Sequence, residues 1–226
     1  MKLVIFDCDG TLIDSQNNIR AAMAWAFEAH RLPVPPREAV LGVVGLSLPQ
    51  SFEVLASDQP EGVRRSLAAH YRDAFVTGPL QQRGPEPLYQ GIATTVATLA
   101  DRADHLLGVA TGKSRRGVAR LFDREGWHPH FHTIQTADDH PSKPDPSMIL
   151  KAMAETGIGA QATVMVGDTA YDMEMARNAG VGAIAVTWGY HDRARLEAAG
   201  AHVVVGEGDA LLSAIDQRMA RQGDVR

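Results

Sequence analysis

The sequence has one cysteine, no long apolar run and no block of positive charge, and each absence excludes a class of protein. With Cys8 alone no intrachain disulfide can form, so nothing points to an oxidising compartment and we predict a cytoplasmic location. The apolar run at 3–6 is too short for a signal peptide or a membrane span, and no other window is apolar enough, so we expect no membrane partner. A net charge of −5, from 22 basic and 27 acidic residues, argues against nucleic acid as the main partner. Phosphorylated small molecules stay possible, because they need positive charge only locally.

The chain has enough apolar residues, 45% of 226, to bury a substantial core, and its patterns alternate between strand and helix. Strand-like apolar runs lie at 3–6, 105–111, 131–135, 162–168, 182–187 and 202–205. Amphipathic helical patterns lie at 89–104, 114–126, 146–156, 170–179 and 193–199. This alternation predicts an α/β fold with a Rossmann-like parallel sheet and helices on both faces. The last residues, 218–226, are typical of a frayed tail.

About ninety residues separate the first predicted strand from the second, far more than one crossover connection needs. Residues 19–30 and 63–75 each carry apolar side chains along one helical face, and a segment rich in proline and glycine, 81–87, marks the return. We therefore predict a Rossmann-like core formed by residues 1–14 and 86–226, with a helical cap inserted at 15–85. The cap would lie over the carboxyl end of the first strand, where open parallel sheets bind ligands.

Two aspartates follow the first predicted strand, in the stretch DCDG. Because side chains alternate along a strand, Asp7 and Asp9 would point to the same side and Cys8 would point away. The two carboxylates repel each other, and a divalent cation, a shared proton or a nearby lysine could compensate them. A strand end followed by an Asp-Gly turn is the plain structural alternative.

Polar residues also follow the other predicted strands or begin the helices after them. They are Thr111, Gly112 and Lys113 in TGKS, Lys143 in SKPDP, and Asp168 and Asp172 in GDTAYD. Each group alone has an ordinary structural explanation as a helix cap, a turn or a solvated charge. Together and in this order, they are better explained as parts of one site.

The four stretches resemble the motifs of the haloacid dehalogenase superfamily of hydrolases, in its phosphatase branch. DCDGTLIDS resembles the first motif of that family, ATGKS the second, SKPDP the third and GDTAYDMEMARNAG the fourth. The resemblance runs from residue 2 to about residue 190. It implies an enzyme that hydrolyses phosphate esters.

The resemblance implies a role for each acid. Asp7 would attack phosphorus and form an aspartyl-phosphate, and Asp9 would donate a proton to the leaving oxygen and later accept one from water. One Mg²⁺ would be bound by Asp7, by the backbone carbonyl of Asp9 and by Asp168. Asp172 would reach the ion directly or through a water molecule, and the sequence does not distinguish the two.

The resemblance also implies how the phosphoryl group is bound. Thr111, Gly112 and Lys113 would contact the transferred group, although a solvated lysine at a helix start is the stronger interpretation of Lys113. Lys143 would place a positive charge against Asp7 and the phosphoryl oxygens, and this charge would offset the repulsion between the acids.

The favoured function is a Mg²⁺-dependent phosphatase of a small phosphorylated metabolite, similar to phosphoglycolate phosphatases. The carbon–halogen hydrolases of the superfamily lack the second acid, which this chain has as Asp9. Phosphomutases of the β-phosphoglucomutase type have a histidine twelve residues after the nucleophile, where this chain has Ile19. A non-catalytic binding protein on the same fold is a further alternative.

The insert should choose the substrate, because the core residues engage only the phosphoryl group and the metal, which all phosphate esters present alike. The charged residues of the insert that we expect near the leaving group are Arg20, Glu53, Arg64 and Arg65. The sequence leaves the oligomeric state open.

Overall fold

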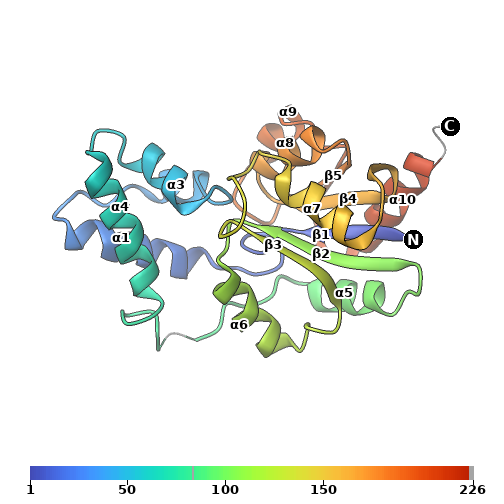
Figure 1. Cartoon of the computed structure of the whole chain (residues 1–226), viewed down its shortest axis with the longest axis horizontal. Coiled ribbons are helices and arrows are strands. Elements are labelled where there is room, and N and C mark those ends of the chain that lie inside the picture. The colour runs from blue at the N-terminus through green and yellow to red at the C-terminus, as the bar shows by residue number, and fades with distance from the viewer. Residues whose placement is uncertain (83, 224–226) are drawn as a thin grey trace.

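In residues 1–82 and 84–223, which the computed structural model describes, six parallel strands form one sheet. The strands are β1 (Lys2–Phe6), β2 (His105–Thr111), β3 (Phe131–Thr136), β4 (Thr163–Gly167), β5 (Gly182–Val186) and β6 (Val203–Val205). They lie in the order β3-β2-β1-β4-β5-β6, and helices flank the sheet on both sides (Figure 1). The predicted α/β class is confirmed, and each predicted strand matches an observed one to within one residue at either end.

β1 is a central strand, and its side chains from Leu3 to Phe6 are all buried. Because side chains alternate along a strand, Leu3 and Ile5 face one side of the sheet, whereas Val4 and Phe6 face the other. Leu3 and Ile5 accordingly belong to one apolar cluster, and Val4 and Phe6 belong to a second. A strand that is covered on both faces needs apolar residues at every position, which explains the unbroken run LVIF.

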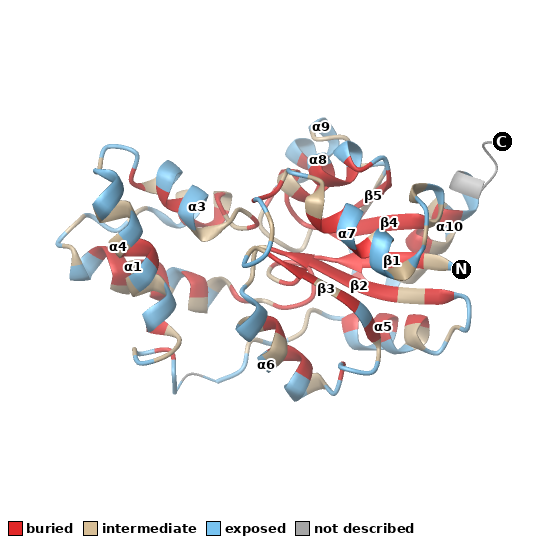
Figure 2. Cartoon of the chain, in the orientation of Figure 1, coloured by how far each residue is buried: buried red, intermediate tan, exposed pale blue. Residues whose placement is uncertain are grey.

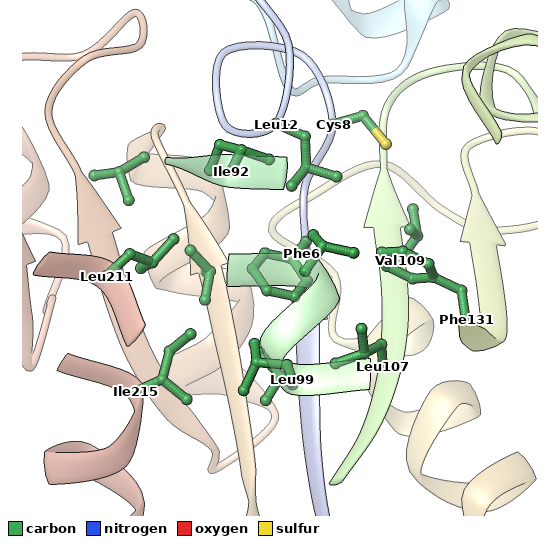
Figure 3. Packing of buried hydrophobic residues seen from close by; sticks show 14 of the residues in the cluster. Phe6, Cys8, Leu12, Ile92, Leu99, Leu107, Val109, Phe131, Leu211 and Ile215 are labelled. Carbon is green, nitrogen blue, oxygen red and sulfur yellow. The ribbon is translucent and has the colours of Figure 1, made fainter. Parts of the chain in front are cut away.

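Each face of the sheet is covered by its own helices. The cluster that contains Phe6 includes side chains of α5 (Ile92–Ala100), α6 (Arg115–Glu125) and α10 (Leu211–Gly223). The cluster that contains Ile5 includes side chains of α7 (Ser147–Thr156), α8 (Ala170–Asn178) and α9 (Arg193–Ala198). Figure 2 shows the buried strands between the helices, and Figure 3 shows Phe6 near Leu99 and Leu107. Within the described part of the chain, no helix is long and apolar enough to cross a membrane.

Helix α10 corrects the prediction of a frayed tail at 218–226. The prediction is wrong for residues 218–223, which continue the helix that begins at Leu211, whereas residues 224–226 lie outside the described residues. Leu211, Ile215 and Met219 recur every fourth residue, and all of them are buried in the cluster around Phe6. Burial of this apolar stripe against the sheet stabilises the helix.

The chain between β1 and α5 forms a helical unit beside the sheet (Figure 1). It contains α1 (Gln16–Ala29), α2 (Arg37–Gly42), α3 (Leu48–Leu55) and α4 (Glu61–Ala74). These helices bury apolar side chains in a cluster of their own, which includes Met23, Phe27, Phe52 and Leu67. The predicted helical insert is therefore confirmed, and we propose 15–85 as its limits.

Phe122 on α6 tests the packing of the cluster around Phe6. The Phe122 ring is fully buried, and its centroid lies 4.7 Å from that of Phe131 and 6.0 Å from that of Trp127. Because Phe122→Ala would leave a cavity here, we expect it to lower the free energy of unfolding by about 3–5 kcal/mol in urea denaturation. The control Val54→Ala changes a residue that is 59% exposed and should cost less than about 0.5 kcal/mol. Equal losses in the two variants would contradict this packing.

Candidate functional site

The carboxyl ends of three neighbouring strands bring the predicted residues together. β1 pairs with β2 on one side and with β4 on the other, so the three strand ends lie next to each other. Asp7 follows β1, Thr111 ends β2 and Asp168 follows β4. Residues that are far apart in the sequence thus meet at the carboxyl ends of the strands, where open parallel sheets bind ligands.

Three carboxylates and one lysine form a buried cluster at these strand ends. We call Asp7, Asp168, Asp172 and Lys143 the buried centre. Carboxylate oxygens of Asp7, Asp168 and Asp172 all lie within 4.8 Å of one another. Lys143 Nζ lies 3.1 Å from Asp7 Oδ2 and 2.6 Å from Asp172 Oδ1. All four residues are at most 1% exposed, so water screens their charges only weakly.

The buried centre carries more negative than positive charge. Burial raises the pKa of Asp7 to about 6, an effect that Lys143 opposes and Asp172 reinforces. Burial also raises the pKa of Asp168 well above its ordinary value, and the charges of Asp172 and Asp7 add to the rise. Burial disfavours a charged Lys143, but Asp172 and Asp7 outweigh burial and raise the pKa of the lysine. One ammonium therefore faces three carboxylates, and a further cation would be needed to keep all three ionised.

The donor set suits a hard divalent cation such as Mg²⁺, because every donor in it is a carboxylate oxygen. Asp168 accepts one hydrogen bond on each oxygen, from the Thr11 hydroxyl at 2.8 Å and from the Tyr190 N–H at 2.9 Å. Each carboxylate oxygen can accept more than one contact, so Asp168 retains lone pairs for an ion. The Thr11 and Tyr190 contacts hold the carboxylate in place.

Asp172 makes contacts that link the end of β4 to Lys143. It is the third residue of α8, and its Oδ2 accepts hydrogen bonds from the Thr169 N–H at 3.0 Å and from the Thr169 hydroxyl at 2.7 Å. Its Oδ1 accepts a hydrogen bond from Lys143 at 2.6 Å. The capping box at the start of α8 therefore fixes Asp172, and Asp172 positions Lys143 beside Asp7.

Two glycines allow the backbone to pack directly on Asp168. A Cβ atom at Gly189 would lie 2.2 Å from Asp168 Oδ2, and a Cβ atom at Gly10 would lie 2.2 Å from the same oxygen. Gly10 also has a φ of +84°, a conformation that residues with a Cβ rarely adopt. A larger residue at either position would displace the carboxylate.

Asp9 contacts a different lysine. Its Oδ1 lies 2.8 Å from Lys113 Nζ, which in turn lies 3.4 Å from Glu86 Oε2. Burial alone would lower the pKa of Lys113, but Asp9 and Glu86 outweigh burial and raise it. The interpretation of Lys113 as a solvated lysine is therefore wrong, since its side chain is only 14% exposed and paired on two sides. Sequence analysis also missed Glu86, because nothing in the proline-rich return from the insert distinguishes it from a solvated acid.

The insert rests on the loops that carry the site. A Cβ atom at Gly112 would lie 2.9 Å from the Leu46 carbonyl oxygen, so the backbone of the insert lies directly on the loop after β2. The Gly42 carbonyl accepts a hydrogen bond from the Tyr171 hydroxyl at 3.0 Å, and it lies 3.3 Å from His191 Nε2. These contacts hold the segment between α2 and α3 against the core.

Asp7 lines a cavity of about 940 Å³ that lies between the carboxyl ends of the strands and the insert. The predicted site residues that line the cavity are Asp7, Asp9, Thr111, Gly112 and Lys113. Lys143, Asp168 and Asp172 are completely buried and are not among the lining residues. The structure thus separates the predicted residues into those that a substrate could touch and those that support Asp7 from within.

The four charged residues that we expected near the leaving group do not line this cavity, so that prediction is wrong. Arg20 and Glu53 are exposed on the surface, Arg65 pairs with Glu61, and Arg64 donates to the Gln59 carbonyl. The insert residues that do line the cavity with polar groups include Asn18, Ser51, Tyr71 and Arg72. Helical periodicity identified the apolar faces of α1 and α4 only, and it carries no information about which polar residues border those faces at the core.

Comparison with known proteins gives consistent matches across the core and the insert. Residues 4–186 match the family model described as haloacid dehalogenase-like hydrolase. The chain is 35% identical over 205 residues to "Probable phosphatase IndB" of Dickeya dadantii, and this match covers 90% of this chain and 88% of the relative. It is 30% identical over 193 residues to a phosphoglycolate phosphatase of Pseudomonas syringae pv. tomato, with coverage of 84% and 71%. The crystal structure of "a predicted phosphatase" from Clostridium acetobutylicum has a TM-score of 0.84 at 26% identity, with coverage of 96% and 98%.

Gly189→Ala tests the close packing on Asp168. Because the new Cβ atom would displace Asp168 Oδ2, we expect the affinity for Mg²⁺ to fall by about 10–100-fold in isothermal titration calorimetry. Gly206→Ala is the matched control, since the nearest atom to its Cβ, Thr187 Oγ1, would lie 3.8 Å away. The same Mg²⁺ affinity in both variants would show that Asp168 does not need this packing.

The raised pKa values of Asp7 and Asp168 make stability depend on pH when metal is removed. In EDTA the folded protein keeps protons on these acids that the unfolded chain has released, so the free energy of unfolding should fall as the pH rises from 3.8 through about 6. A Mg²⁺ ion bound by these carboxylates would compete with their protons, so Mg²⁺ should raise Tm more at about pH 8 than at about pH 5. Thermal unfolding with EDTA and with Mg²⁺ at both pH values measures the effect.

The control for this pH dependence is a pair of Asp→Asn variants. Asp7→Asn removes one of the two acids, so its Mg²⁺-induced rise in Tm should depend less on pH. Asp58→Asn changes an exposed aspartate of the insert and should behave as the unmodified protein does. A Mg²⁺ effect of equal size at both pH values in the unmodified protein would argue against carboxylate ligands.

Proposed function

Since this chain belongs to the haloacid dehalogenase-like hydrolase family, we propose that it is a Mg²⁺-dependent phosphatase that hydrolyses a small phosphorylated metabolite through an aspartyl-phosphate on Asp7. The chain is a phosphoric monoester hydrolase, in line with its phosphatase-named relatives. The observation that carries the mechanism is the position of Asp7, which lines the cavity and is backed by Lys143 and by the buried carboxylates of Asp168 and Asp172.

The residues that would hold Mg²⁺ are Asp7, Asp168 and the backbone carbonyl of Asp9, with Asp172 beside them. When bound, the ion would supply positive charge that offsets the phosphoryl oxygens and so lets a carboxylate approach phosphorus. The excess of negative charge in the buried centre supports this assignment, because it leaves a place for a cation that Lys143 alone does not fill.

Asp7 and Asp9 would divide the reaction into two displacements. In the first, an oxygen of Asp7 bonds to phosphorus while the bond to the leaving oxygen breaks, and Asp9 gives that oxygen its proton. In the second, Asp9 takes a proton from water, the water oxygen bonds to phosphorus, and the bond between phosphorus and Asp7 breaks. Lys143, at 3.1 Å from Asp7, would orient the nucleophile and offset charge on the phosphoryl oxygens.

Thr111, Gly112 and Lys113 would bind the phosphoryl group from the loop after β2. The Thr111 hydroxyl accepts a hydrogen bond from the Lys113 backbone N–H at 3.2 Å, which fixes the start of this loop. Lys113 would have a second task, because its ammonium lies 2.8 Å from Asp9 and holds the acid at the site.

Phosphoglycolate and comparably small sugar or acid phosphates are the first substrates to test. The relative from Pseudomonas syringae is named a phosphoglycolate phosphatase, which supports this choice. Asp9 argues against carbon–halogen hydrolysis, and Ile19 in place of a histidine argues against a phosphomutase. A cytoplasmic location, predicted from the single cysteine, completes the proposal.

Asp7→Asn should abolish Mg²⁺-dependent release of phosphate from p-nitrophenyl phosphate, because an amide does not act as the nucleophile. Asp9→Asn keeps the size of the side chain and loses the proton transfer, so we expect a loss of about 10²–10⁴-fold in kcat. EDTA should stop the reaction, Mg²⁺ should restore it, and Ca²⁺ should inhibit it because its looser coordination misplaces the phosphoryl group.

Asp58→Asn is the control for these assays, since Asp58 is exposed on the insert and should not affect turnover. Unchanged turnover in a pure preparation of Asp7→Asn would remove the nucleophile assignment. Full activity in EDTA would contradict the proposed metal site.

A further inference from the structure

A row of polar side chains leads from Asp9 along the cavity. Lys113 Nζ lies 2.8 Å from Asp9 Oδ1 and 3.4 Å from Glu86 Oε2, and Asn18 Nδ2 donates to Glu86 Oε1 at 3.2 Å. All four residues line the cavity, and we call Asp9, Lys113, Glu86 and Asn18 the polar row. If Asp9 protonates the leaving oxygen, the leaving-group atoms next to that oxygen lie beside the polar row.

Tyr71 on α4 brings a hydroxyl to the same part of the cavity. Burial raises the pKa of the phenol and the charge of Asp9 adds to the rise, so the hydroxyl is protonated and can donate a hydrogen bond. No hydrogen bond among residues 1–82 and 84–223 engages this hydroxyl. Tyr71 therefore offers a donor to a bound molecule.

The polar row has no cation free to bind an anion. Lys113 is its one ammonium, and the carboxylates of Asp9 and Glu86 both pair with it. Among residues 1–82 and 84–223, the arginines that line the cavity are exposed, so water and salt screen their charges. They are Arg72, Arg116, Arg120 and Arg124.

The insert contributes a largely aliphatic wall to the cavity. Its lining side chains include Ile19, Met23, Val43 and Leu46. These four side chains accept the C–H surface of a carbon skeleton and carry no charge of their own. The polar row is therefore the part of the cavity that distinguishes one leaving group from another.

We propose that the substrate is the phosphate ester of a small uncharged polyol, such as a sugar phosphate, and that Glu86 selects it against carboxylate-bearing esters. The inference rests on the proposed function, because it takes Asp9 as the contact of the leaving oxygen. A polyol hydroxyl can donate to Glu86 and accept from Lys113, Asn18 or Tyr71. The carboxyl carbon of phosphoglycolate is only two bonds from the ester oxygen, so its negative charge would lie beside Glu86, and the one ammonium of the polar row is already paired with two carboxylates.

Matched pairs of substrates isolate the charge of the leaving group. 2-Hydroxyethyl phosphate differs from phosphoglycolate, and glycerol 3-phosphate differs from 3-phosphoglycerate, only by a CH₂OH group in place of a carboxylate. We would measure kcat/KM for phosphate release by the full chain with Mg²⁺. We expect the uncharged member of each pair to be preferred by about tenfold or more. An equal or higher kcat/KM for the carboxylate member overturns the inference.

Glu86→Gln tests the residue that makes the selection. The amide keeps the size of the side chain and removes its charge, so the preference for the uncharged member should fall by about tenfold. Glu53→Gln is the matched control, because it removes the same charge from an exposed position of the insert and should leave the preference unchanged. The same change of preference in both variants would remove Glu86 as the selecting residue.

Failure of the inference and failure of the proposed function give different results. If neither substrate pair nor p-nitrophenyl phosphate releases phosphate with Mg²⁺, the proposed function is wrong and the inference falls with it. If p-nitrophenyl phosphate is hydrolysed and the carboxylate members are equal or better substrates, the proposed function stands and only the inference is overturned.

Discussion

The repulsion among three buried carboxylates is the constraint on which the rest of the site depends. Asp7, Asp168 and Asp172 come from the ends of two neighbouring strands and the start of α8, and the fold holds their oxygens within 4.8 Å of one another. Burial of like charges is unfavourable, and the buried Lys143 compensates only part of it. The Thr169 capping box and the glycines beside Asp168 are needed because carboxylates that repel each other would otherwise turn away. This unfavourable arrangement lies at the place where the proposed function needs a cation and an anionic substrate.

Separate lysines give the two acids of DCDG different surroundings. Asp7 contacts Lys143 in the buried centre, whereas Asp9 contacts Lys113 at the cavity. Cys8 lies between them and packs in the cluster around Phe6, so the alternation of β1 continues past its last hydrogen-bonded residue. The two carboxylates therefore differ both in their cationic partner and in their exposure, which is 1% for Asp7 and 13% for Asp9.

Contact between the insert and the core creates the cavity. The Gly42 carbonyl contacts Tyr171 on α8, and Leu46 lies on the loop after β2. The Ser47 N–H donates to the Ser142 hydroxyl at 2.6 Å. The polar row is likewise shared, because Lys113 belongs to the core and Asn18 belongs to α1. Under the proposed function, selection of the leaving group would depend on the interface between insert and core, whereas binding of the phosphoryl group would depend on the strand ends.

The sequence by itself determined the strands of the sheet, the helices of the core up to α9, the position of the insert and the acids and lysines of the four motifs. The strands and helices follow from local rules, since side-chain alternation and helical periodicity are properties of neighbouring residues. The motif residues were identified by their resemblance to a family, and among them Asp7, Thr111 and Asp168 lie at strand ends, whereas Lys143 lies in a loop and Asp172 in α8. Only the tertiary structure decided that α10 is a helix, because its apolar stripe is stabilised by the sheet it covers. It also decided the partners of Lys113, Glu86 and Asn18. These residues come from separate segments, and their pairing depends on how the insert sits on the core, which no local pattern encodes.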